Sequence, residues 1–106
     1  GSHSLKFSSE EANFSGKADF TKTGRDEYSV KGSASSGNNS LNIEGTMKRI
    51  SEKHLNFDGK ISQKINGKSY TRDKKTTFAN EGKGNFWRLQ DKVNGDGFVD
   101  YIDINF

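Results

Sequence analysis

Four segments of the chain carry apolar residues at every second position, followed at the same spacing by a glycine. They are residues 12–18, 28–34, 41–47 and 55–61. The positions between are mostly Ser, Lys, Asn, Glu, Thr and Asp. A period of two is typical of a β-strand with one buried and one solvated face, and no segment sustains a helical period. The sequence therefore predicts an all-β fold.

The glycines in these segments also indicate how the strands pair. We predict that Phe20 lies opposite Tyr28 and that Met47 lies opposite Leu55. The second register places a glycine opposite the large side chain of Phe57, and complementary sizes of this kind fill the interior of a closed barrel. Inward glycines also permit the sharp coiling that closure requires. We interpret them as structural, with the alternative that they clear space for a ligand.

Turn signals divide the rest of the chain into short strands. Asn66-Gly67 is a type I′ hairpin signal, and Asn94-Gly95-Asp96-Gly97 predicts a second tight hairpin with Val93 opposite Phe98. With a first strand at residues 5–7, the chain forms an antiparallel up-and-down meander of about eight strands. We predict a small closed barrel, because closure removes exposed sheet edges. It is similar to lipocalin-like barrels in strand number and order, but lacks their Gly-x-Trp motif on the first strand. The alternative is an open twisted sheet completed by a partner.

Length and composition limit the classes of function. The chain has 106 residues, 28% of them apolar, with 17 basic and 14 acidic residues and no cysteine. We assign residues 1–3 to a purification-tag remnant and residues 4–106 to a single β-barrel domain. Basic and acidic residues are mixed, and the basic residues are not flanked by aromatic side chains that could stack on bases. We therefore expect no nucleic-acid partner. No stretch reaches the roughly 20 apolar residues of a membrane span. The Ser-, Asn-, Gly- and Lys-rich composition favours a secreted, periplasmic or cell-surface location.

The two predicted hairpins bring a polar cluster to the inner face of the sheet. Its members are Tyr70, Arg72, Lys74, Asp91 and Asp100. Asp91 lies opposite Asp100 in the predicted register, and facing carboxylates destabilise a sheet unless a cation neutralises them. We therefore expect either Arg72 or Lys74 to lie between them. The cluster is interpreted either as a satisfied internal network or as the polar anchor of a ligand pocket.

A calcium loop is the second candidate site. The spacing of Asn94, Asp96, Asp100 and Asp103 resembles the ligand run of such loops. Aligning Asn94 and Asp96 on the third and fifth positions places Lys92 at the first, where an acid is required. We therefore interpret the stretch as a hairpin turn and expect no metal and no other cofactor, with calcium as the less favoured alternative.

Catalytic chemistry has little support, because the only histidine outside the assigned tag is His54 and cysteine is absent. Our leading hypothesis is a non-catalytic extracytoplasmic barrel that binds a small amphipathic or anionic ligand in its interior. The aromatic residues expected to line that pocket are Phe14, Phe20, Tyr28, Phe57, Phe78 and Trp87. The alternative is a solidly packed domain, monomeric or homodimeric, that binds a protein or glycan through its outer face, where Phe86 and Tyr101 form an aromatic patch.

Overall fold

The computed structural model describes residues 1–106 and consists of nine β-strands joined by turns and loops. The strands are β1 (Ser2–Ser8), β2 (Asn13–Gly24), β3 (Glu27–Ser36), β4 (Asn39–Ser51), β5 (His54–Ile65), β6 (Lys68–Arg72), β7 (Thr76–Ala79), β8 (Phe86–Leu89) and β9 (Tyr101–Asn105). The structure has no helix of the length and apolar character needed to cross a bilayer.

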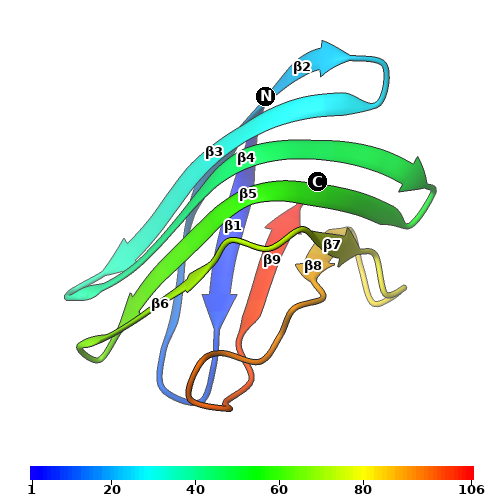
Figure 1. Cartoon of the computed structure of the whole chain (residues 1–106). Coiled ribbons are helices and arrows are strands. Elements are labelled where there is room, and N and C mark those ends of the chain that lie inside the picture. The colour runs from blue at the N-terminus through cyan, green and yellow to red at the C-terminus, as the bar shows by residue number, and fades with distance from the viewer.

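The strands form one antiparallel sheet that closes on itself. Its order is β4-β3-β2-β1-β9-β8-β7-β5-β6, and β4 also pairs with β5. β6 and β7 pair with opposite halves of β5 in one continuous register, with Ile61 opposite Arg72 and Leu55 opposite Phe78. The result is a closed eight-stranded barrel with β6 as an additional strand that shares the position of β7 (Figure 1). The predicted all-β meander and closed barrel are confirmed, and the chain does not adopt the open sheet.

Two predicted strand registers are wrong by two residues. Phe20 lies opposite Val30 rather than Tyr28, and Met47 lies opposite Phe57 rather than Leu55. The long strands run past their predicted ends into short turns, and each of these two pairings contains an irregularity near the turn. Because the shift is an even number of residues, every side chain keeps its predicted face of the sheet.

Two inward glycines allow β4 and β5 to approach each other closely. Gly45 and Gly59 lie directly opposite one another. A Cβ on Gly59 would collide with the carbonyl oxygen of Glu44 and lie 2.6 Å from the Cα of Gly45. The Phe57 ring lies over the same space, since its Cζ would be 2.9 Å from that Cβ. These positions therefore support the structural interpretation of the glycines.

The barrel interior is filled by a core of nineteen buried apolar side chains. Phe57, Phe78 and Trp87, which were predicted to line a ligand pocket, all belong to this core. The rings of Phe57 and Phe78 meet edge to face with their centroids 5.8 Å apart, and the Trp87 ring meets that of Phe106 at 6.1 Å. These aromatic residues therefore pack against protein side chains and stabilise the fold.

The first three residues are part of the barrel structure. β1 begins at Ser2, and the amino group of Gly1 donates a hydrogen bond to the carbonyl oxygen of Phe20 at 2.7 Å. The His3 ring contacts the rings of Phe20 and Phe106. The assignment of residues 1–3 to a tag stays a prediction, but in this structure they extend the sheet.

Candidate functional site

The candidate site lies at the end of the barrel that residues 90–100 cross (Figure 1). The base of the last hairpin has the predicted register, with Trp87 opposite Ile104. The predicted Val93–Phe98 pair is wrong, because Val93 lies opposite Val99. The reason is a three-residue loop: the amide of Asn94 donates to the Phe98 carbonyl, which leaves one more residue inside the turn than a two-residue hairpin holds.

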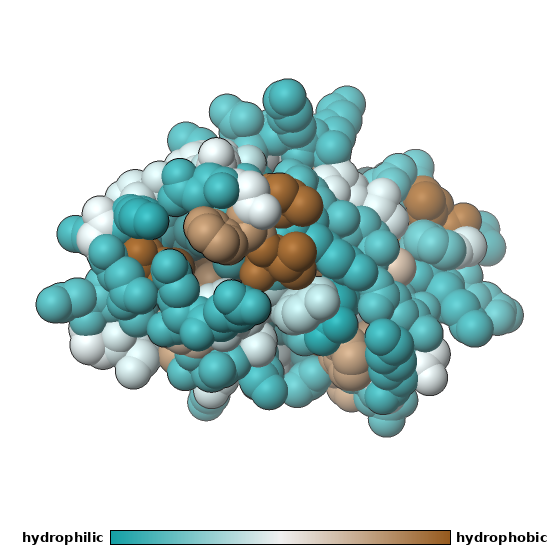
Figure 2. Space-filling model, turned by 90° about the horizontal axis from the view of Figure 1, so that it is seen from below, coloured by the Kyte–Doolittle hydropathy of each residue, from teal (hydrophilic) through white to brown (hydrophobic).

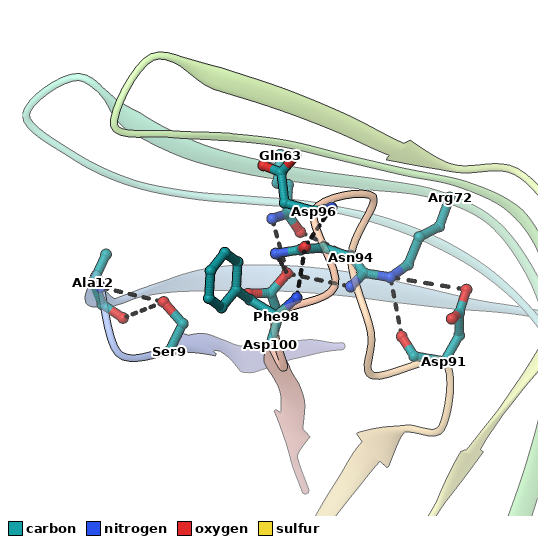
Figure 3. A network of polar contacts seen from close by, with 9 residues as sticks. All are labelled: Ser9, Ala12, Gln63, Arg72, Asp91, Asn94, Asp96, Phe98 and Asp100. Carbon is teal, nitrogen blue, oxygen red and sulfur yellow. Dashed lines mark hydrogen bonds and ion pairs between the residues drawn. The ribbon is translucent and has the colours of Figure 1, made fainter.

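Arg72, on β6, is the centre of a buried polar network beneath this segment (Figure 3). Its Nη1 donates to Oε1 of Gln63 at 2.7 Å, and its Nη2 donates to Oδ2 of Asp100 at 3.3 Å. Its Nε donates to the backbone oxygen of Asp91 at 3.0 Å and lies 3.9 Å from the Asp91 carboxylate. Arg72 therefore lies between the two carboxylates, as one of the two predicted arrangements requires.

Asp100 receives the other contacts of this network. Its side chain is only 3% exposed, and its Oδ2 accepts hydrogen bonds from Gln63 at 2.9 Å and from Asn94 at 3.2 Å in addition to Arg72. No fully buried polar side-chain atom of the chain lacks a hydrogen bond. A buried ion pair offsets its desolvation cost only when such further hydrogen bonds are made, so the network ties residues 90–100 firmly to β5 and β6.

Two members of the predicted cluster depart from their predicted roles. Lys74 is exposed in the interruption between β6 and β7, because the chain leaves β5 after Arg72, and so it does not enter the inner face. Tyr70 places its ring 5.0 Å from the guanidinium of Arg72, so it joins the cluster through a cation–π contact and not through a hydrogen bond. Gln63 on β5 bridges Arg72 and Asp100, and no local sequence pattern marks it as part of the site.

The weak metal candidates are engaged elsewhere in the structure. Oδ1 of Asn94 accepts the backbone amides of Asp96 and Phe98, which stabilises the turn. Asp103 forms two hydrogen bonds with Arg88, at 2.8 and 3.0 Å. No three His, Cys, Asp or Glu residues converge in a way that could hold a metal ion. The expectation of no metal and no cofactor stays a prediction.

Arg88 contacts both rings of the aromatic patch expected on the outer face, of which Tyr101 is 37% exposed. Its guanidinium lies 5.1 Å from the centre of the Phe86 ring and 4.1 Å from that of Tyr101. Its pKa is raised, first by its hydrogen bonds to Asp103, which lies directly opposite on β9. A register with Trp87 opposite Ile104 also sets Arg88 opposite Asp103, so this pair could have been derived from the sequence.

Glu81 completes the outer network, and its lowered pKa implies that the stability of the fold depends on pH. Hydrogen bonds from Lys92 at 2.8 Å and Gln90 at 3.0 Å, reinforced by the charges of Lys92 and Arg88, lower the pKa of Glu81 from 4.5 to about 2. Because the folded-state pKa lies below the unfolded value, this contribution to stability is complete above pH 4.5 and is lost as the pH falls toward 2. We expect the stability difference between wild type and Glu81→Gln to shrink over that range in urea denaturation.

The matched control for this measurement is Glu11→Gln, since Glu11 is exposed and forms no ion pair within the chain. Its stability difference from wild type is expected to change much less with pH. A Glu81→Gln difference that stays constant from pH 5 to pH 2.5 would contradict the assigned role of Glu81.

Residues 90–100 also carry an exposed apolar group, here named the Phe98 patch. It consists of Val93, Phe98 and Val99, which are 52%, 57% and 46% exposed. Seen from this end of the barrel, a group of hydrophobic residues stands among hydrophilic ones (Figure 2). A hollow of about 280 Å³ adjoins the patch, lined by Ser9, Glu10, Glu11, Asn94, Gly97, Phe98, Val99 and Asp100.

Comparison with known proteins gives a family but no function. The model of the PM1083 family matches residues 1–106, and the chain therefore belongs to this family. No curated protein and no solved structure matches the chain significantly. Since a fold by itself does not imply a function, a functional proposal has to rest on the geometry of the site.

Proposed function

We propose that this member of the PM1083 family is a non-catalytic domain that binds a protein partner through the Phe98 patch. One observation carries the proposal: three large apolar side chains are about half exposed on a segment held from beneath by the Arg72 network. Clustered exposed apolar residues are typical of interaction sites. Loops displayed on a rigid scaffold are where binding residues are concentrated.

The backbone that carries the patch is fixed before any partner binds. Asn94 accepts the amide of Gly97 at 3.0 Å and donates its own amide to the Phe98 carbonyl at 2.8 Å. The amide of Asp100 donates to the carbonyl of Lys92 at 2.8 Å. A preorganised surface loses little conformational entropy on binding, which favours affinity.

A protein partner is favoured over the two other ligands considered. An interior ligand would have to displace core side chains such as Phe57 and Phe78, which already pack against each other. A glycan stacking on the outer face would have to displace Arg88 from the rings of Phe86 and Tyr101. Interior binding and an extracytoplasmic location stay predictions.

A displayed library of random peptides tests this proposal. We expect peptides selected on the wild-type domain to lose affinity for the Phe98→Asn variant. Phe98 lies outside the buried core, so the variant should fold normally. Truncating a hot-spot aromatic residue costs about 2 kcal/mol or more, which is roughly thirtyfold in Kd. Fluorescence anisotropy of the selected peptides on both proteins measures the change.

The matched control is Ile50→Asn, because Ile50 is 53% exposed and lies on β4, outside residues 90–100. The selected peptides are expected to bind this variant with wild-type affinity. Peptides that bind Phe98→Asn as tightly as wild type, or that lose affinity only for Ile50→Asn, would show that the Phe98 patch is not the binding surface.

A further inference from the structure

We infer that the hollow beside the Phe98 patch receives a basic side chain of the partner, an arginine or a lysine. The inference rests on the proposed function and specifies the chemistry of the partner. Its basis is the combination of an apolar surface with a hollow whose charged lining residues are all acidic, two of them without an ion-pair partner.

The charges around the hollow are unusual for this chain. Three of the lining residues are acidic, namely Glu10, Glu11 and Asp100, and none is basic, although basic residues outnumber acidic ones in the chain by 17 to 14. Neither Glu10 nor Glu11 forms an ion pair with another residue of the chain. Their charges are therefore available to a partner, and complementary charges raise both the association rate and the specificity of binding.

Asp100 provides an acceptor deeper in the hollow. All the hydrogen bonds that its side chain accepts reach Oδ2, so Oδ1 has no partner within the chain. Since no fully buried polar side-chain atom is left unpaired, Oδ1 must meet solvent, and Asp100 lines the hollow. Figure 3 shows Asp100 beside the ring of Phe98. A cationic group entering here would therefore meet a carboxylate oxygen next to an aromatic ring.

The hollow suits a long organic cation better than a metal ion. Its walls combine Phe98 and Val99 with the acidic residues, which matches a side chain that has an apolar stem and a charged end. No cluster of acidic side chains in the chain has the convergence that a metal ion needs. The turn before β2 holds Glu11 in place, because Ser9 Oγ accepts the backbone amides of Glu11 and Ala12, each at 3.2 Å.

The test is an NMR titration of the ¹⁵N-labelled domain with N-acetyl-arginine amide. N-acetyl-norleucine amide, which has an apolar stem and no charge, is the matched ligand control. We expect the arginine compound to shift amide resonances of residues 9–12 and 94–100, and the norleucine compound to leave them nearly unchanged. The Glu10→Gln/Glu11→Gln variant should bind about three- to tenfold more weakly, since two exposed ion pairs are lost. Added salt should weaken binding to the wild type.

The outcomes separate this inference from the proposed function. Three results would overturn the inference. The two compounds could shift the amide resonances equally, or the Glu10→Gln/Glu11→Gln variant could bind as well as the wild type. The shifted amides could also lie near carboxylates elsewhere in the chain. Peptides that depend on Phe98 but carry no basic residue would also overturn it, while the proposed function would stand. Selected peptides that bind the Phe98→Asn variant as tightly as the wild type would overturn the proposed function, and with it the inference.

Discussion

Replacing Arg72 with methionine should destabilise the domain by about 3–5 kcal/mol, because it leaves Asp100 charged and buried without its cation. The Arg72 side chain is 1% exposed, and it alone contacts Gln63, Asp91 and Asp100 at once. Methionine fills much of the same volume but supplies no hydrogen-bond donor. Urea denaturation at pH 7 measures the loss, and a decrease of less than about 1 kcal/mol would show that the pair does not hold the barrel end together.

A double variant separates the charge from the packing. Arg72→Met/Asp100→Leu removes both members of the pair, and such replacements are often neutral or stabilising in buried sites. We expect it to recover most of the stability that Arg72→Met loses. It should not recover binding of the selected peptides, because residues 90–100 would no longer be tied to β6 through Asp91 and Asp100. Stability and binding are therefore expected to diverge in this variant.

The outline of the fold was within reach of the sequence because alternation and turn signals are local. The Asn66-Gly67 turn has positive φ at both residues, as a type I′ turn requires. A two-residue turn at these positions sets Ile61 opposite Arg72 and Leu55 opposite Phe78, and both pairs are observed. The registers of β2 with β3 and of β4 with β5 were out of reach, since a pattern of period two is unchanged by a shift of two residues.

The candidate site was predicted in part. The need for a cation between Asp91 and Asp100 followed from the predicted register, which set the two carboxylates opposite each other. The observed register places Asp100 opposite Lys92 instead, but Arg72 still contacts both aspartates. The choice of Arg72 over Lys74 depends on where the chain leaves β5. The predicted pairing of Val93 with Phe98 places Phe98 on the same face of the sheet as the buried Ile102. The extra residue in the turn places it outside instead, so the proposed binding surface arises where the local rule fails.

Replacing Gly59 with alanine should destabilise the domain by about 3 kcal/mol or more, at the upper end of the range for overpacking. The new Cβ would meet the Glu44 carbonyl and the Cα of Gly45, which are backbone atoms and cannot move away by rotating a side chain. The Phe57 ring closes the remaining side, because its Cζ would lie 2.9 Å from the new atom. Thermal and urea denaturation measure the loss.

Gly24→Ala is the matched control for this substitution. A Cβ on Gly24 would find its nearest neighbour at 3.4 Å, an oxygen of the flexible Glu27 side chain, and the residue has no positive φ. Its stability is therefore expected to stay within about 1 kcal/mol of the wild type, with the lower entropy of the unfolded chain favouring alanine. The pair of variants also decides between the two interpretations of the inward glycines. If Gly59→Ala proved as stable as Gly24→Ala, the space beside Phe57 would be open, and this result would support the alternative that the glycines clear space for an interior ligand.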